Sequence, residues 1–322
     1  MPAPSTSLGT LRPELGTLYE FDLNNNRSGF IGYRVMPILN VKTAADKFGR
    51  IPTEQLGKLA TVTRNSSGSY NRIHWTFTDD SYATKEYGLE GPVDNRNARL
   101  YDEYFKAEVA TTQLVTHNVL ANAEKRVADA VFNTTTFTSY TTSVSTEWSS
   151  ASATPITDVM AASQLVRNRT GRYANALVIC RKVRRNLVNV TQIIDRIAAS
   201  GAGDKVKPAD ITDAQLAACF DVDYVIVADS SYDSTTEGQS TTFSDIWDDE
   251  YAMVCRVAQT DSIEEPCIGR TFHWTGDGSS PDGTVEVYES KEVRGEVVRV
   301  RHDVHEKVIY PECGQLLANI TA

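Results

Sequence analysis

Two histidines three residues apart, His302 and His305, are candidates for chemistry because paired imidazoles can bind a transition metal. They lie in a stretch where polar and apolar residues alternate, which is typical of a β-strand. Residues three apart in a strand point to opposite faces of a sheet, so these imidazoles cannot easily share an ion. The sequence therefore predicts two solvated or rim histidines and no metal site.

A second candidate is an acidic run, DIWDDE, whose carboxylates are Asp245, Asp248, Asp249 and Glu250. Such a group could bind Mg²⁺ or supply a general acid and a general base. A charged loop that faces solvent or a basic neighbour explains the same run. A cytosolic α/β enzyme formed by residues 153–285 with these four acids is kept as an alternative.

Other motifs for catalysis or cofactor binding are missing or misplaced. Gly201-Ala-Gly203 follows a predicted helix and lacks the third glycine of a dinucleotide loop, so we interpret it as a helix-ending turn. Neither G-x-S-x-G nor G-x-x-x-x-G-K-[ST] occurs in the sequence. We therefore expect no catalytic residue, no metal and no cofactor.

The five cysteines are widely spaced, and most have apolar neighbours. Their number is odd and no pair has the spacing of zinc ligands, which predicts buried thiols in a reducing cytoplasm. These residues are Cys180, Cys219, Cys255, Cys267 and Cys313.

Composition and charge limit the function further. The chain has 322 residues, of which 41% are hydrophobic and 23% charged, as in an ordinary folded protein. Its 42 acidic and 32 basic residues give a net charge of −10, which disfavours a protein that coats DNA or a membrane surface. The sequence shows no secretory signal and no transmembrane helix.

The elements that would position these residues begin with two extended regions. Residues 1–30 contain prolines and glycines but no periodic apolar face, so we expect an extended arm. From 31 to about 90, strands are predicted at 38–41, 59–62 and 72–78, with turn formers between them. This long hairpin-like excursion is rich in basic residues, which predicts that it meets an acidic surface elsewhere. Those residues are Lys42, Lys47, Arg50, Lys58, Arg64 and Arg72.

A long helix is the clearest element. Residues 98–132 contain neither proline nor glycine, and their apolar residues recur on one helical face. A helix of that length reaches about 50 Å, so it must act as a spine for separate layers. The Thr/Ser-rich segment 133–152 with its interleaved aromatic residues predicts exposed strands.

Compact α/β sequence follows residue 153. Helices are predicted from Pro155 to a closing Gly171, over 183–197, and from the Thr212/Gln215 capping box to Phe220. Between them and after them we expect strands at 174–180, 222–228, 251–257 and 268–274, with a polar loop at 229–244. The alternation around 298–308 predicts one long strand that packs back near the spine helix.

The order of these elements resembles that of the major capsid proteins of tailed bacteriophages, whose fold is shared with encapsulins and the floor of herpesvirus capsids. The resemblance extends from about residue 31 onward and lies in the order of several segments. These are 155–187 (PITDVMAASQLVRNRTGRYANALVICRKVRRNL), 211–228 (ITDAQLAACFDVDYVIVA), 245–247 with 251–257, 269–274 (GRTFHW) and 313–320 (CGQLLANI).

The resemblance implies an α+β capsid fold with five parts. They are an N-terminal arm (1–30), an E-loop hairpin with adjoining strands (31–95), a peripheral domain with the spine helix (96–152), an axial α/β domain (153–285), and a C-terminal strand that returns to the peripheral domain (286–322). In this family the E-loop lies over a neighbouring subunit. Some relatives crosslink an E-loop lysine to an asparagine, but neither that asparagine nor the assisting glutamate can be matched here for Lys42, Lys47 or Lys58.

The implied function is structural and not enzymatic. We expect the chain to assemble into pentamers and hexamers of an icosahedral shell that encloses double-stranded DNA without sequence-specific binding and without a membrane. Its expected location is the virion, after assembly in the cytoplasm of a bacterial host. Expected partners are a portal, a cement protein and a scaffolding protein. The scaffold is expected to be a separate protein because no scaffold-like segment precedes the arm, unless the sequence is already trimmed. An encapsulin-like compartment is the alternative within the fold.

Overall fold

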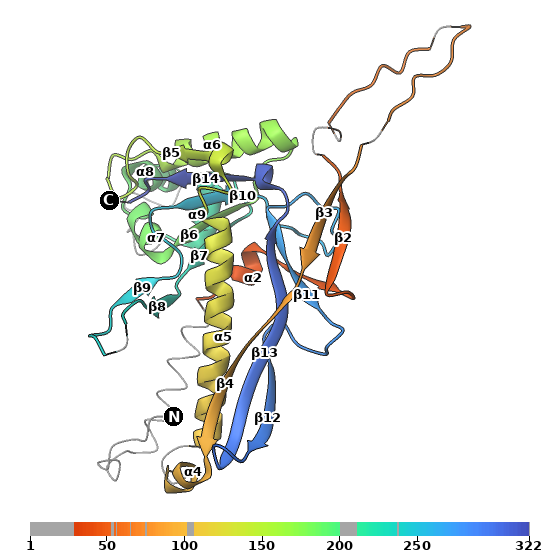
Figure 1. The fold of residues 1–322 in the computed structure, drawn as a ribbon. Coiled ribbons are helices and arrows are strands. Elements are labelled where there is room, and N and C mark those ends of the chain that lie inside the picture. Colours follow the sequence, from red (N-terminus) through yellow and green to blue (C-terminus); the bar gives the residue numbers. More distant parts are fainter. Residues whose placement is uncertain are drawn as a thin grey trace.

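The computed structural model describes residues 29–52, 55, 57–64, 66–74, 76–101, 106–199, 211–236 and 238–321. Almost all of the expected arm, and the Gly201–Gly203 turn, lie outside the described residues. Figure 1 shows a long helix that runs between a group of helices and strands and an elongated sheet, and a hairpin that extends away from both.

Two five-stranded sheets organise the chain. In the first, the order is β1-β11-β13-β12, and β4 pairs with the other edge of β13. In the second, the order is β5-β14-β10-β6-β7. The strands of the first sheet are β1 (Ile38–Val41), β4 (Lys85–Asp94), β11 (Gly269–Trp274), β12 (Thr284–Ser290) and β13 (Gly295–Val308). Those of the second are β5 (Thr141–Ser143), β6 (Ala176–Cys180), β7 (Tyr224–Ala228), β10 (Ala252–Cys255) and β14 (Gly314–Ala318).

Two short hairpins and several helices complete the fold. The hairpins pair β2 with β3 and β8 with β9. Their strands are β2 (Ala45–Arg50), β3 (Thr78–Ala83), β8 (Ser231–Asp233) and β9 (Phe243–Asp245). The helices are α2 (Gly32–Val35), α4 (Asn95–Tyr101), α5 (Ala107–Val131), α6 (Pro155–Thr170), α7 (Arg181–Leu187), α8 (Thr191–Ala199) and α9 (Asp213–Phe220), with 3₁₀ turns η2 (Thr138–Tyr140) and η4 (Pro311–Cys313). Among the described residues, no helix is long and apolar enough to cross a membrane.

The predicted spine helix is present but shorter than expected. Instead of one helix over 98–132, the chain forms α4 and then the 25-residue α5, which spans about 37 Å. Lys106 has an extended backbone (φ −76°, ψ 103°), so the helix starts anew at Ala107.

α5 joins the two sheets into one molecule. Its first half packs on the first sheet, where Val115 and Val119 contact Val300 of β13. Its last turns enter a large core that also holds β6 and β10, through Val127 and Val131. The predicted long strand is β13, and it packs along α5.

Several predicted helices beside the second sheet are confirmed. α6 starts at Pro155 and ends at Gly171, whose φ of 72° favours glycine, and the Thr212/Gln215 capping box opens α9. The predicted helix over 183–197 is wrong in its continuity, because α7 ends at Leu187 and α8 begins at Thr191. The polar loop 229–244 contains β8 and the start of β9.

Two other expectations are wrong. Segment 133–152 contains one short strand, β5, and its aromatic residues Phe137 and Trp148 are buried in the main core rather than exposed on strands. The C-terminal segment 286–322 does not pack entirely on the first sheet. β13 belongs to the first sheet, whereas β14 pairs with β10 in the second sheet. The fold therefore divides by sheet and not by consecutive sequence.

Close approach of β4 to α5 depends on a glycine. A Cβ at Gly91 would lie 2.8 Å from Val115 Cγ2 and even nearer to Thr111 Cγ2. We expect Gly91→Ala to lower the free energy of unfolding by about 2 kcal/mol, because the helix must move off the strand. Gly49→Ala on β2 is the control, since a Cβ there meets no atom within 4 Å. Urea unfolding measures both; equal stabilities would contradict this account of the contact.

Candidate assembly interface

The most exposed part of the described chain is the loop 57–77 between β2 and β3, which extends away from the body (Figure 1). Leu59 and Val62 are 97% and 90% exposed. Tyr70, Ile73 and Phe77 are also exposed. The strands predicted at 59–62 and 72–78 are wrong apart from Thr78, because no described strand pairs with these residues. These side chains lie open to solvent, although the Arg64 guanidinium lies over the Tyr70 ring, 4.9 Å from its centroid.

The base of this loop, in contrast, is firmly anchored. Tyr82 of β3 stacks on Phe272 of β11 with 4.6 Å between ring centroids, and Phe48 of β2 packs against both rings. Arg50 forms an ion pair with Glu312 and lies 4.4 Å above the Tyr310 ring.

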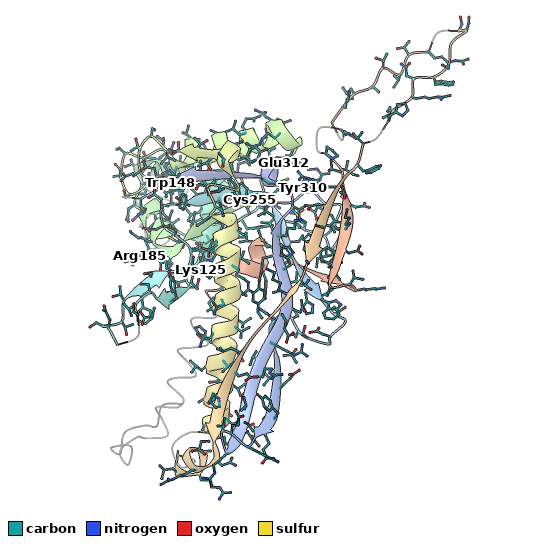
Figure 2. The ribbon with its side chains drawn as sticks, viewed as in Figure 1. Lys125, Trp148, Arg185, Cys255, Tyr310 and Glu312 are labelled. Atoms are coloured by element: carbon teal, nitrogen blue, oxygen red, sulfur yellow. The ribbon has the colours of Figure 1, made fainter. Side chains whose placement is uncertain are left out.

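Glu312 and Tyr310 follow the end of β13, so the hairpin is fixed to the first sheet (Figure 2). Lys307 of β13 adds an ion pair with Asp80 of β3. A rigid stem therefore presents an apolar loop to whatever lies outside the subunit.

A buried carboxylate on α5 connects this helix to α2 and to the segment between β9 and β10. Glu124 of α5 is 4% exposed and accepts hydrogen bonds from the backbone N–H groups of Ile31 (2.8 Å) and Gly32 (2.7 Å) at the start of α2. It also accepts one from Trp247 Nε1 (2.6 Å), on the segment between β9 and β10. Burial raises the pKa of the Glu124 carboxyl even though three donors face it. Sequence reasoning missed this residue, because a lone glutamate on a helix has no distinguishing spacing.

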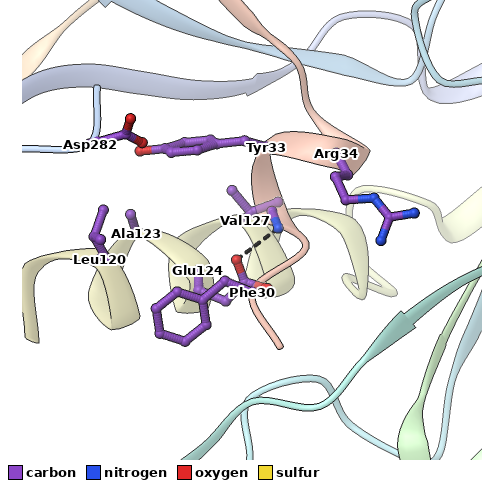
Figure 3. Close-up of a pocket in the computed structure, with 9 residues that line it drawn as sticks. Phe30, Tyr33, Arg34, Leu120, Ala123, Glu124, Val127 and Asp282 are labelled. Atoms are coloured by element: carbon purple, nitrogen blue, oxygen red, sulfur yellow. Dashed lines mark hydrogen bonds between the residues drawn. The ribbon is translucent and has the colours of Figure 1, made fainter. Parts of the chain in front are cut away.

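Beside Glu124 lies a pocket of about 190 Å³ with an apolar floor (Figure 3). Leu120, Ala123 and Val127 of α5 form one side, and Tyr33 of α2 and Asp282 close the other. The Tyr33 hydroxyl donates to the Pro281 carbonyl (3.0 Å), and His302 of β13 contacts the same oxygen through Nδ1 (3.1 Å).

His302 is fully buried, so the prediction that it is solvated is wrong. Arg126 of α5 contacts its Nε2 at 3.3 Å and forms an ion pair with Glu306. Since Arg126 can only donate, His302 Nε2 accepts and Nδ1 carries the hydrogen. Burial lowers the pKa of His302, and it also lowers the pKa values of His273 and His305.

Two carboxylates of the acidic run accept hydrogen bonds from the C-terminal segment. Asp249 forms an ion pair with Lys182 and accepts a hydrogen bond from Thr321 Oγ1 (2.9 Å), and Glu250 accepts one from the Asn319 N–H (3.1 Å). Burial raises the pKa of Asp245, whereas Asp248 accepts from the backbone of Glu250. The structure thus brings these acids together but engages three of them, Asp248, Asp249 and Glu250, in structural bonds.

Metal and thiol chemistry have no site in the described ranges. No group of three or more His, Cys, Asp or Glu side chains there could hold a metal ion. The five cysteines are buried and free, as the sequence predicts. Burial raises the thiol pKa of Cys180 and of Cys267 to about 11 and that of Cys313 to about 12.

The comparisons with known proteins agree on one fold. No established family profile matches the sequence. The chain is 25% identical over 277 residues to the major capsid protein of Burkholderia phage BcepMu, across 82% of this chain and 86% of that protein. Its structure is similar to a phage-related protein from Bordetella bronchiseptica RB50 (TM-score 0.66, 19% identity, 94% and 97% of the two chains). It is also similar to the capsid protein of cyanophage P-SCSP1u (TM-score 0.59, 9% identity, 88% and 86%).

This fold is the α+β fold that phage capsid proteins share with encapsulins. Within that class, the sequence relatives are major capsid proteins of phages.

The Glu124 junction gives a first prediction. Glu124→Ala leaves three buried donors without an acceptor, so the free energy of unfolding should fall by about 3 kcal/mol or more. Asp129→Ala on the exposed side of the same helix should change it by less than about 0.5 kcal/mol. Chemical denaturation followed by tryptophan fluorescence measures both variants. A Glu124 variant as stable as the Asp129 variant would sink the proposed role.

A second prediction concerns pH. Burial lowers the pKa of His302 in the folded chain, whereas in the unfolded chain this histidine has a pKa of about 6.5. As pH falls through that value, the unfolded chain binds more protons than the folded chain, and the folded chain loses stability. The loss of unfolding free energy between about pH 7.5 and about pH 5.5 should be smaller in His302→Gln than in the wild type. His74→Gln in the exposed loop should keep the wild-type dependence; the same dependence in all three proteins would refute this assignment.

Proposed function

We propose that this chain is the major capsid protein of a tailed bacteriophage and that many copies close into an icosahedral shell around double-stranded DNA. The observation that carries the proposal is the contrast between the anchored hairpin of β2 and β3 and the exposed apolar side chains of loop 57–77. Holding such side chains in water has an unfavourable free energy, which burial in a neighbouring copy offsets. Sequence similarity to phage major capsid proteins supports the same role.

The parts of the chain take their roles from this assembly. Loop 57–77 with its hairpin is the E-loop within 31–95, and residues 1–30 are the arm. The first sheet with α4 and α5 is the peripheral domain, which takes in β11, β12 and β13. The second sheet with its helices is the axial domain, which takes in β5 and β14 as well as the part of 153–285 that lies outside the first sheet. In this proposal the axial domain surrounds the five-fold and six-fold positions of pentamers and hexamers.

Charge supports a container rather than a DNA-binding protein. A net charge of −10 repels phosphate, so a wall of such subunits does not hold the genome by its backbone. We further propose that a scaffolding protein, a portal and a cement protein act with the shell, that assembly takes place in the bacterial cytoplasm and that the product is the virion. No membrane takes part in this scheme.

The enzyme alternative depends on the acidic run and has little support. Asp249 and Glu250 are engaged with Lys182 and with the C-terminal segment. The relatives are structural capsid proteins. The proposed role is therefore structural and not enzymatic.

The test replaces residues 57–76 with a short Gly/Ser linker, which leaves β2, β3 and their anchors intact. We expect a folded subunit with near wild-type circular dichroism that no longer forms closed particles, because its intersubunit apolar surface is gone. Electron microscopy of both proteins after expression measures the outcome. Particles of unchanged number and shape would exclude the role of the loop, and a wild type that stays monomeric would exclude the capsid function itself.

A further inference from the structure

The outer edge of β12 is an exposed, unpaired strand edge. β12 pairs with β13 along seven residues and with no other strand of the described chain. Figure 1 shows it at the margin of the first sheet, away from α5. An exposed edge of this length presents free backbone N–H and C=O groups and is a ready site for a further strand.

The side chains of β12 fit an interface better than a permanently solvated edge. Val285 and Val287 are 45% and 46% exposed. They stand opposite Val300 and Val298 of β13, which are fully buried under α5. The apolar face of the sheet thus continues past its cover onto β12. A strand placed beside β12 would extend that face and remove the two valines from water.

Charge at this edge indicates a basic partner. Glu289 of β12 lies directly opposite Glu296 of β13, and both are exposed. Like charges in such a pair repel each other. The turn between the two strands carries Glu292 together with Lys291 and Arg294, so the repulsion is centred on the Glu289–Glu296 pair itself. A cation supplied by a partner would relieve this repulsion.

One segment of this chain has the matching properties. Gly57–Arg64 is fully described, exposed along its length and paired with no described strand. It carries Lys58 and Arg64 and no acid, and Thr61, Val62 and Thr63 give it a strong tendency to form a strand. Its eight residues match the seven of β12 in length. The stem holds it away from its own β12 (Figure 1), so its partner edge belongs to another copy.

We propose that Gly57–Arg64 of one copy adds to the edge of β12 in a second copy as a further strand. This inference rests on the proposed function and names the surface that receives the loop. Main-chain hydrogen bonds provide the affinity. In a strand, Ala60 and Val62 share a face with Lys58 and Arg64, so these two apolar side chains meet the two valines while the basic residues meet the glutamates.

The test crosslinks mixed copies. Wild-type protein with ¹⁵N and with ¹⁴N label is co-assembled and treated with a carbodiimide, which joins amines to carboxylates in direct contact. Mass spectrometry should identify mixed-label peptides that join Lys58 to Glu289, Glu292 or Glu296. The pair Lys47 and Asp79, which is in contact within one subunit, provides the internal control.

Each result decides a different point. Particles without a Lys58 link to these glutamates would overturn this inference and leave the capsid function standing, whereas absence of particles would overturn both. Mixed-label links from Lys291 to Glu286 or Glu289, without a Lys58 link, would identify a second β12 as the partner and would also overturn the inference.

A variant of the edge gives an independent readout. Val285→Lys combined with Val287→Lys places cations beside the basic segment and blocks the strand edge, so association should weaken by at least about tenfold. Leu114→Lys on α5 is the matched control, because its side chain is similarly exposed but lies off this edge. Circular dichroism establishes that each variant folds, and light scattering measures assembly. Equal assembly in the edge variant and the control would refute the proposal.

Discussion

The whole subunit depends on how one buried carboxylate is satisfied. Glu124 receives donors from α2 and from the segment that follows β9, while its own helix packs on the first sheet. An unpaired carboxylate at that depth would be very costly, so the three elements are held in a single arrangement. α5 transmits this arrangement from the main core to the distal end of β13. The two sheets therefore behave as one body, and the stem of β2 and β3 has a fixed platform.

The second sheet could be predicted well because its signals are local. The capping box of α9, the glycine that ends α6 and the apolar run of β6 each carry their own physical cause. The path of the C-terminal segment could not be predicted in the same way. β14 crosses to the second sheet through pairing with β10, a long-range contact that leaves no periodic trace in the sequence.

The sequence predicted only part of the candidate interface. The basic excess of the excursion predicted a protruding segment that needs a partner, and its exposure agrees with that expectation. The strand pattern around Ile73 and Phe77 was misleading, because alternation shows that a segment is able to form a strand and not that a partner lies within the same chain. Glu124 and the burial of His302 could not be read from spacing at all, since each depends on elements distant in sequence.

The five cysteines have a consequence for the durability of a particle. Each thiol is buried, and burial raises the thiol pKa values of Cys180 and Cys313. Almost no thiolate of these two residues therefore exists at neutral pH. Oxidants attack the thiolate form, and none of these sulfur atoms lies on the surface. The cysteines are therefore protected from oxidants as long as the subunit stays folded.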